Sequence, residues 1–477
     1  MKKRIAALVA ACMLLAVMAP AVAAADYQKS AQFMGYFERN NVTNTIEDTK
    51  PGGYTYVNPD AQLTTVADAV GIAFRTTHAP GPDDWPQFHY NVKHDGYSPS
   101  TGLPSDNSSA WSKYFPVIGT VNPIIANGKV FILTGYAGFD EPAGLTTINL
   151  TCLDESDPSQ ILWNFTLPRT IHWGSWAAPA TDGDYVYVSS DDKHYAINVT
   201  TGEEVWNFTG FSYVSNGGPA ISDDMVFLSD SGDYSIPLKN GTYYGLNKAN
   251  GALRWTFNWT NANPVFKYSQ ASPAYDATDN SVYVTGYNAD YNQGYLYKVN
   301  ATTGVQIWSN YTATGVILGG SASFDTDNVY VTSYLYGGNG KLYAYSKDTS
   351  VLKWSKTIAG TDATPAIANG LVYVSGGTAG SGGSTGVYAY YTDGTLAWRK
   401  LNAGMGGWTD SVSVANGYAF VGHENSTYPI YSYDSIYALN ATTGATVWFY
   451  PQGGATAAIA NSKVYTNGNN GYLYRFG

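Results

Sequence analysis

The sequence predicts an all-β fold: an eight-bladed β-propeller of four-stranded antiparallel blades. Three observations predict it: the composition, a hairpin signal that recurs eight times, and a tryptophan that keeps step with that signal. The 477 residues include 41 Tyr and 51 Gly but only 13% charged residues, whereas helices are built mainly from Ala, Leu, Glu and Lys. The apolar share of 44% is that of a globular protein and excludes wholesale disorder.

The hairpin signal is a short β-branched and aromatic run, usually preceded by a turn rich in Asn, Asp and Gly. Its eight copies begin at Asn127, Asp182, Asp223, Asp279, Asp327, Asn369, Asn416 and Asn461. Eight tryptophans follow with an average spacing of about 48 residues: Trp111, Trp163, Trp206, Trp255, Trp308, Trp354, Trp398 and Trp448. Strands alone at a period of this size predict propeller blades.

Within a repeat, the third strand ends in a tight turn that contains glycine. A tryptophan follows four residues after Gly202, Gly251, Gly304, Gly394 and Gly444, and Ser350 takes the place of the glycine before Trp354. Glycine suits a turn position that needs a positive φ, and the tryptophan then begins the fourth, outer strand.

The two ends of the chain complete one blade. After Trp448 there is room for three strands, the last within 472–477, with no tryptophan strand to follow. Trp111 belongs to a tryptophan strand that lacks the three strands before it. Pairing the two closes the ring and hides both sheet edges, so we expect the N-terminal tryptophan strand to close the last blade.

The repeat resembles that of the quinoprotein-type (PQQ-like) propeller family. Tyr437-Ala-Leu-Asn440 with Thr443-Gly444 and Trp448 carries the resemblance best, and the opening 84–98 is similar to the segment before the first blade of that family. The resemblance covers about residues 84 to 477 and implies the propeller fold. It leaves activity open, because the family includes quinone-dependent dehydrogenases and cofactor-free binding scaffolds.

The chain divides into three predicted parts. Residues 1–25 have the form of a signal peptide: cations at Lys2, Lys3 and Arg4, an apolar run, and small residues up to Ala25. If it is not cleaved, the same run is long enough to span a bilayer. Residues 26–83 form an N-terminal extension or spacer, and 84–477 form the propeller.

Charge and cysteine content limit the partners. The formal net charge is −11, and it becomes −14 without the first 25 residues, which hold three cations and no acids. We therefore expect no nucleic-acid partner and no contact with a membrane except through an uncleaved N-terminal segment. Cys152 alone remains after cleavage, so no internal disulfide can form.

The resemblance to the quinoprotein-type family raises the question whether this protein is an enzyme. Quinone-dependent dehydrogenases need a cation held beside the quinone, a carboxylate base, basic residues for the quinone carboxylates and often a vicinal cysteine pair. No adjacent cysteines occur here, and no catalytic residue of that kind can be mapped onto this sequence. The six histidines have no metal-ligand spacing. We therefore expect no enzymatic activity, no cofactor and no metal, with a PQQ-dependent dehydrogenase as the enzymatic alternative.

A candidate ligand site is predicted near the ring axis, where the innermost strands begin. Its aromatic residues are Trp173, Trp176, Tyr268 and Trp408. They form either a stacking platform for a sugar or other flat ligand, or packing that fills the entrance.

Seven Asn-x-Ser/Thr sequons are candidates for glycosylation. Four fall beside a blade tryptophan on the predicted outer strand: Asn164, Asn207, Asn258 and Asn310. Three fall in the Thr-Gly turns: Asn198, Asn300 and Asn440.

Export, acidity and a closed ring favour a non-enzymatic protein of the cell surface. We expect a self-assembling component of the cell envelope or surface layer, located outside the cell, whose partners are copies of itself or other envelope proteins, with possible glycans. One alternative is an envelope adaptor that binds a specific protein or glycan. The other is the PQQ-dependent dehydrogenase.

Overall fold

The computed structural model describes residues 45–47, 55–57, 78–116, 121–135, 147–168, 177–190, 193–211, 217–232, 240–312, 315–334, 338–377, 384–401, 404–424, 433–468 and 470–477. The chain divides into two units, Met1–Thr77 and His78–Gly477. In the first unit, β1 (Thr45–Glu47) and β2 (Thr55–Val57) pair as an antiparallel hairpin. The predicted signal peptide lies outside the described residues. In the described ranges, no helix has the length and hydrophobicity needed to cross a bilayer.

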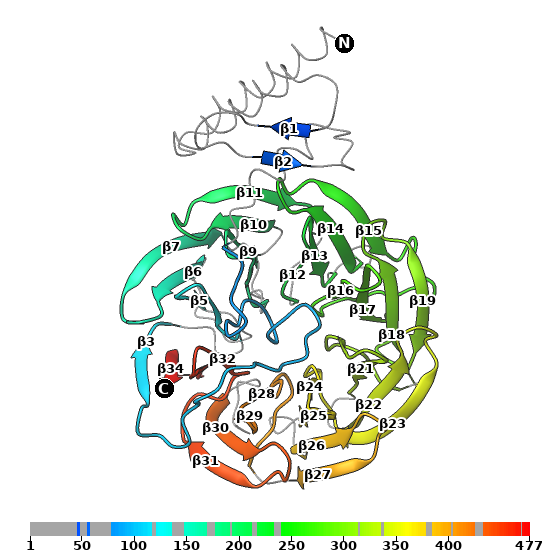
Figure 1. The fold of residues 1–477 in the computed structure, drawn as a ribbon. Coiled ribbons are helices and arrows are strands. Elements are labelled where there is room, and N and C mark those ends of the chain that lie inside the picture. The colour runs from blue at the N-terminus through cyan, green and yellow to red at the C-terminus, as the bar shows by residue number, and fades with distance from the viewer. Residues whose placement is uncertain are drawn as a thin grey trace. The chain divides into compact units, whose positions relative to one another are not determined.

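The second unit is the predicted eight-bladed propeller of four-stranded antiparallel sheets (Figure 1). From the innermost strand to the outermost, blade 1 consists of β4 (Ile124–Ala126), β5 (Lys129–Thr134), β6 (Thr147–Asp154) and β7 (Ile161–Pro168), and blade 2 of β8 (Ala180–Thr181), β9 (Tyr185–Ser190), β10 (Lys193–Asn198) and β11 (Glu204–Thr209). Blade 3 consists of β12 (Ala220–Ile221), β13 (Met225–Asp230), β14 (Thr242–Asn247) and β15 (Leu253–Asn258), and blade 4 of β16 (Ala274–Asp276), β17 (Ser281–Tyr287), β18 (Gly294–Asn300) and β19 (Gln306–Tyr311).

Blades 5 to 8 follow the same order, from the innermost strand to the outermost. Blade 5 consists of β20 (Ser323–Phe324), β21 (Asn328–Thr332), β22 (Asn339–Ser346) and β23 (Leu352–Ala359), and blade 6 of β24 (Ala366–Ala368), β25 (Leu371–Gly376), β26 (Gly386–Tyr391) and β27 (Leu396–Leu401). Blade 7 consists of β28 (Ser413–Ala415), β29 (Tyr418–Glu424), β30 (Tyr433–Asn440) and β31 (Thr446–Tyr450), and blade 8 of β32 (Ala458–Ala460), β33 (Lys463–Asn467), β34 (Tyr472–Phe476) and β3 (Trp111–Tyr114).

The ring closes as the sequence predicts. Strand β3 pairs antiparallel with β34, so that Trp111 lies opposite Arg475 and Tyr114 opposite Tyr472. The last blade therefore combines the two ends of the propeller sequence, and neither β3 nor β34 is left as an open edge on that side.

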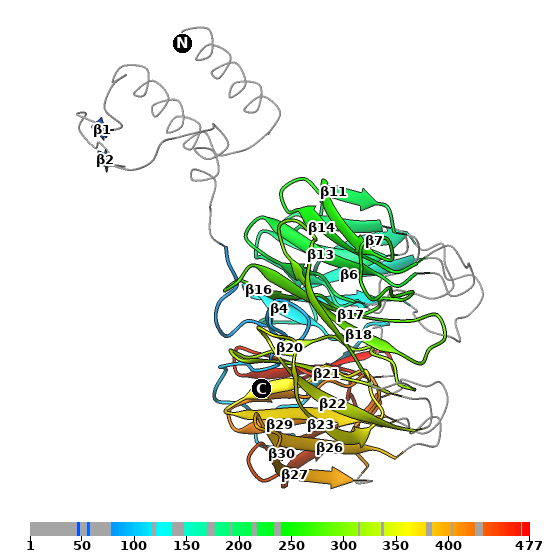
Figure 2. The same ribbon diagram turned by 90° about the vertical axis from the view of Figure 1, so that its right-hand side faces the viewer.

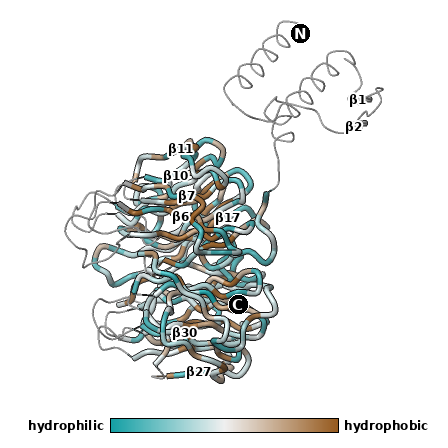
Figure 3. The backbone as a smooth tube through the Cα atoms, turned by 90° about the vertical axis from the view of Figure 1, so that its left-hand side faces the viewer, coloured by the Kyte–Doolittle hydropathy of each residue, from teal (hydrophilic) through white to brown (hydrophobic). Residues whose placement is uncertain are grey.

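The core lies between neighbouring blades. Apolar side chains of β5 and β6 in blade 1 pack against β9 and β10 in blade 2, and the same arrangement recurs between blades 4 and 5 and between blades 6 and 7. Figure 3 shows hydrophobic stretches running through the strands of the propeller. Each blade is covered on both faces by its neighbours, so both faces must be apolar. This explains why the inner strands are continuous runs of apolar and aromatic residues.

Six of the eight blade tryptophans join their own blade to the next through the indole N–H. The indole N–H of Trp206 donates to the carbonyl oxygen of Lys248 at 3.0 Å, and that of Trp398 donates to Ala441 at 2.9 Å. The turn glycine of the next blade lies directly against the indole, since a Cβ on Gly251 would stand 2.5 Å from the ring of Trp206. The Gly-to-Trp spacing thus encodes contacts between blades as well as a turn within one.

A segment that we call the strap, residues 83–103, crosses the axis on one side of the ring (Figure 1, and in blue in Figure 2). Backbone hydrogen bonds join it to the inner strands: Trp85 donates to Ile125, Tyr275 to Val92, Ile367 to Asp95, and Val414 to Gly96, all at 2.7 to 2.8 Å. His89 and His94 of the strap are fully buried. We call the space around the ring axis, between the innermost strands, the hub. The strap fills one end of the hub, and we call the opposite end, where the innermost strands begin, the mouth.

Candidate functional site

The mouth of the hub is bound together by side-chain hydroxyls that precede the inner strands. The backbone N–H of Gly218 donates to Ser272 Oγ at 2.8 Å, Ser272 N–H to Ser321 Oγ at 2.9 Å, and Ser411 N–H to Thr456 Oγ1 at 2.9 Å. Each bond joins one blade to the next. These equivalent positions form a collar around the axis, and Asp410 directly precedes one of them, Ser411.

Aromatic side chains of four loops and strands meet at this mouth. Tyr268, Tyr287, Ile317, Tyr334 and Trp408 form one buried cluster, in which the rings of Tyr334 and Trp408 lie edge to face with centroids 4.7 Å apart. Two of the predicted platform residues, Tyr268 and Trp408, are thus brought together. Trp408 is only 1% exposed and Tyr268 5%, so both rings serve as packing. Trp173 and Trp176 lie outside the described residues.

Three acidic residues lie near Trp408, and the Glu424 carboxylate contacts its backbone directly. Glu424 Oε2 accepts the Trp408 N–H at 2.8 Å, and the Trp408 carbonyl oxygen accepts the Asp362 N–H at 3.2 Å. Asp410 Oδ2 accepts the Gly422 N–H at 2.8 Å. Glu424 and Asp410 are buried, and Asp362 is partly exposed. We call Asp362, Asp410 and Glu424 the acid cluster.

Two of these acids hold their protons unusually tightly. Burial, together with the nearby Glu424 carboxylate, raises the pKa of Asp362 to about 8. Burial likewise raises the pKa of Asp410 to about 8, against hydrogen bonds from Gly422 and Ser375 that favour its ionised form. Desolvation and neighbouring negative charge are the ordinary causes of such shifts. At neutral and acid pH, both groups are therefore carboxylic acids that can donate a proton.

A tyrosine completes this side of the mouth. Tyr433 Oη accepts the Thr409 N–H at 3.1 Å. Burial, with Glu424 and Asp410 nearby, holds the pKa of Tyr433 well above its usual value. The phenol therefore stays neutral and fixes the loop that carries Asp410. Strongly shifted titrating groups gathered at a hub mouth are the usual mark of a reactive site.

Sequence reasoning missed the acid cluster, although one signal for Asp410 is visible in retrospect. The residue before the collar hydroxyl is small in five other blades: Gly217, Ala271, Gly320, Ala363 and Ala455. Only the structure shows that these positions are equivalent, because the collar hydrogen bonds define them.

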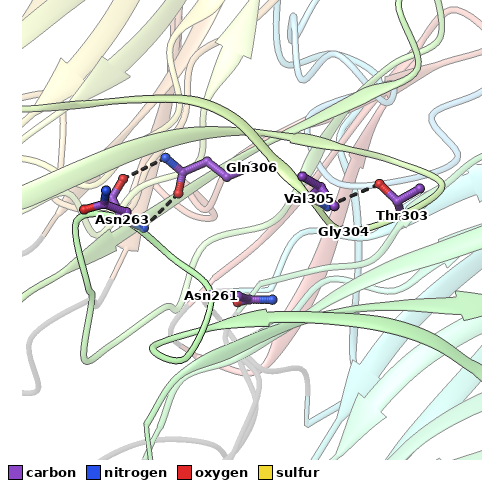
Figure 4. Close-up of a pocket in the computed structure, with 6 residues that line it drawn as sticks. All are labelled: Asn261, Asn263, Thr303, Gly304, Val305 and Gln306. Atoms are coloured by element: carbon purple, nitrogen blue, oxygen red, sulfur yellow. Dashed lines mark hydrogen bonds between the residues drawn. The ribbon is translucent and has the colours of Figure 1, made fainter.

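A groove on the outer rim, between the loop after β15 and the turn before β19, is lined by polar groups (Figure 4). Its cavity has a volume of about 400 Å³. Gln306 exchanges two hydrogen bonds with the backbone of Asn263, at 2.7 and 2.8 Å. These amides hold the loop in place, so we assign no chemistry to this groove.

The candidate glycosylation sites lie on the rim, as the predicted outer strands and turns require. Asn164 and Asn207 are exposed on β7 and β11, and Asn258 and Asn310 lie half-buried at the ends of β15 and β19. In the turns, the side-chain oxygens of Asn198, Asn300 and Asn440 accept backbone N–H groups two and three residues later. Glycosylation itself stays a prediction.

The described residues of the hub do not fit a quinone and its cation. Cys152 is buried in β6, and Arg254, Arg399 and Arg475 lie on β15, β27 and β34, away from the mouth. Within the described ranges, no group of three or more His, Cys, Asp or Glu side chains is placed to hold a metal ion. We therefore derive no step through a quinone.

Fold and repeat define the class of protein: a PQQ-like β-propeller. The chain belongs to the PQQ_2 family, described as outer membrane protein assembly factor BamB, whose family model matches residues 147–290 and 292–458. Similar solved structures include a europium-containing methanol dehydrogenase (TM-score 0.62, 12% identity, 81% of this chain and 90% of that chain). They also include the quinohemoprotein alcohol dehydrogenase of Comamonas testosteroni (0.62, 13%, 85% and 82%) and BamB of Moraxella catarrhalis (0.54, 16%, 77% and 97%). At these identities the likeness shows the fold alone.

One curated relative shares more sequence. The tetrathionate hydrolase of Acidithiobacillus ferrooxidans is 25% identical over 340 residues, which is 64% of this chain and 63% of the relative. The chain thus spans less than two thirds of that relative's length.

The expectation that this protein is not an enzyme is contradicted by its sequence relative, which is a hydrolase. That expectation depended on missing quinone-binding residues. Hydrolysis needs no quinone, only groups that move protons, and the acid cluster supplies such groups.

Proposed function

We propose that this protein is a hydrolase of the cell envelope that cleaves an anion containing a sulfur–sulfur bond, with the acid cluster of Asp362, Asp410 and Glu424 as its acid and base groups. The observation that carries the proposal is the presence of two aspartic acids with pKa values of about 8 at the collar of the hub, near the Glu424 carboxylate. The relation to a tetrathionate hydrolase supports the substrate class. The predicted signal peptide supports the location.

The chemistry of such a cleavage suits neutral carboxylic acids. When water attacks one sulfur atom, the sulfur–sulfur bond breaks and its electron pair leaves with the other sulfur. The attacking water must lose a proton, whereas the departing sulfur anion is too weak a base to take one and needs only a hydrogen bond. The Glu424 carboxylate can take the proton from water, and a protonated carboxyl group of Asp362 or Asp410 can donate the hydrogen bond to the departing anion.

Charge also favours protonated acids at this mouth. The protein is strongly acidic overall, with a formal net charge of −11, so ionised aspartates at the mouth would repel an anionic substrate. Protonation of Asp362 and Asp410 removes two negative charges from the site. The Lys267 ammonium, 5.6 Å from the centre of the Tyr268 ring, adds positive charge beside the aromatic cluster.

The test is an assay of the purified protein with tetrathionate and trithionate between pH 3 and 8, with thiosulfate and sulfate measured by ion chromatography. From tetrathionate we expect thiosulfate, sulfate and elemental sulfur, and from trithionate thiosulfate and sulfate, each at a rate above that of buffer alone. The proposal fails if neither substrate is turned over at any pH while circular dichroism shows a folded β protein.

A further inference from the structure

A second cavity lies between the ends of blades 7 and 8, apart from the acid cluster. Its volume is about 470 Å³, and it is lined by residues that include His423, Asp434, Tyr437, Phe449, Gln452 and Asn470. His423 and Glu424 are neighbours on β29, so their side chains point to opposite faces of the blade. Glu424 faces the loop of Trp408, whereas His423 faces this cavity.

One wall of the cavity is aromatic. The rings of Tyr437 and Phe449 lie 4.8 Å apart at an angle of 38°, because Tyr437 of β30 and Phe449 of β31 are directly opposite in the ladder. Phe449 is 41% exposed. An apolar ring held at the surface by its neighbour in the ladder offers a flat face to a ligand.

The rest of the cavity is polar and already ordered. Asp434 Oδ1 lies 2.9 Å from His423 Nδ1 and accepts the Ser435 hydroxyl at 3.1 Å. On the blade 8 side, Gln452 Oε1 accepts the Asn470 amide at 2.6 Å and the Tyr474 hydroxyl at 2.5 Å. These bonds fix a carboxylate, an imidazole and two amides around one space, which lowers the entropy lost when a ligand binds.

Charge decides which ligand suits the cavity. None of the described residues that line it is Lys or Arg, so an anion would have no cationic partner. Its single carboxylate already meets His423 and the Ser435 hydroxyl, so a bare cation gains little there. A neutral ligand with one apolar face and an edge of hydroxyl groups would satisfy both walls.

We propose that this cavity binds a pyranose sugar, whose C–H face packs on Phe449 and whose hydroxyls meet Asp434, His423 and Gln452. The volume lies in the range of natural ligand sites, about 300 to 1,000 Å³. This site stands independently of the proposed hydrolase function. A stacking site for a sugar at the hub mouth would need exposed rings, and Trp408 there is buried.

The test is saturation-transfer NMR of the full chain with glucose, galactose, mannose and N-acetylglucosamine, each as the free sugar and as an oligosaccharide. We expect transfer to the protons of one face of at least one free sugar, with a dissociation constant on the order of 1 mM, as its size allows. Transfer from none of them at 20 mM, about 20 times that constant, would overturn the proposal. Oligosaccharides that bind more tightly than the free sugar would identify a polysaccharide as the source.

Substitutions of cavity residues test whether the sugar binds at this place. Phe449→Ala and Asp434→Asn should each weaken binding about tenfold or more, whereas Tyr391→Ala, which removes an equally exposed ring (50%) from β26 of blade 6, should leave it unchanged. Because Phe449 is largely at the surface, its loss should not unfold the blade, and a melting curve checks this. Wild-type binding by both cavity variants contradicts the assignment.

Discussion

The indole N–H of Trp255 in blade 3 donates to the carbonyl oxygen of Ala301 in blade 4 at 2.7 Å, and Gly304 packs against the same ring. A Cβ on Gly304, which has a φ of +71°, would stand 2.8 Å from the indole. We therefore predict that Gly304→Ala lowers the free energy of unfolding by about 3 kcal/mol, through strain at positive φ and displacement of the tryptophan.

Gly370→Ala is the matched control for this prediction. Gly370 has a φ of +77° but no atom within 4 Å of the new Cβ, so only the backbone strain of about 1 kcal/mol remains. Urea unfolding of both variants gives the difference. Equal losses would show that the contact with Trp255 contributes nothing.

The second prediction concerns the acid cluster. Asp410→Asn keeps the size of the side chain but replaces its acidic O–H group with a weaker N–H donor, so turnover of tetrathionate should fall by a factor of about 10 or more. Asp393→Asn, in the exposed turn after β26, is the control and should keep full activity. Steady-state kinetics should show the loss in kcat. A change confined to KM would instead indicate a role in binding.

The third prediction follows from the raised pKa of Asp410. The folded protein holds this proton up to about pH 8, whereas the unfolded chain loses it near the ordinary pKa of about 4. The unfolded state therefore binds fewer protons between these values, so stability falls as pH rises from about 4 to 8. One such group contributes a slope of at most about 1.4 kcal/mol per pH unit.

Denaturant unfolding across this range measures that slope. Asp410→Asn should flatten the profile, because it removes one of the two groups, and Asp362→Asn should flatten it further. A wild-type profile that rises from pH 4 to 8 would contradict the assignment of protonated acids.

The fourth prediction concerns glycans. The outer strand leaves Asn164 and Asn207 exposed, so we expect peptides carrying them to be modified when the protein is isolated from its own cells. The Asn207 amide donates to Glu204 at 2.6 Å, and this bond must open before a sugar is attached. Intact-peptide mass spectrometry decides the matter. Unmodified peptides throughout would end the proposal.

The ring could be predicted from the sequence because each blade repeats the same local events. Gly202, Gly251 and Gly444 mark turns with positive φ, and the tryptophan after each marks an outer strand. Closure of the ring could be predicted because three strands follow Trp448 without a tryptophan strand, whereas the tryptophan strand at Trp111 has no three strands before it. The strap's path across the axis could not be predicted, since its hydrogen bonds are to backbone groups of distant blades and need no particular side chain.

The acid cluster escaped sequence reasoning for a similar reason. Asp362, Asp410 and Glu424 belong to no motif of fixed spacing, and they meet only because blades 6 and 7 are neighbours in the ring. The raised pKa values of Asp362 and Asp410 arise mainly from desolvation, which is a property of the folded hub and of no segment alone. The tryptophans at the mouth drew the sequence interpretation instead, although Trp408 proves to be part of the packing around the acids.

The pairing of Trp111 with Arg475 also sets the timing of folding. Strand β3 is among the first parts of the propeller to be synthesised, yet its partner β34 is the last. A nascent chain must therefore keep the aromatic residues of β3 from wrong partners until the final residues arrive. A chain that stops before Tyr472 lacks β34, so β3 has no strand to pair with and the last blade cannot close. The unpaired strand would make such a product a substrate for cellular proteases.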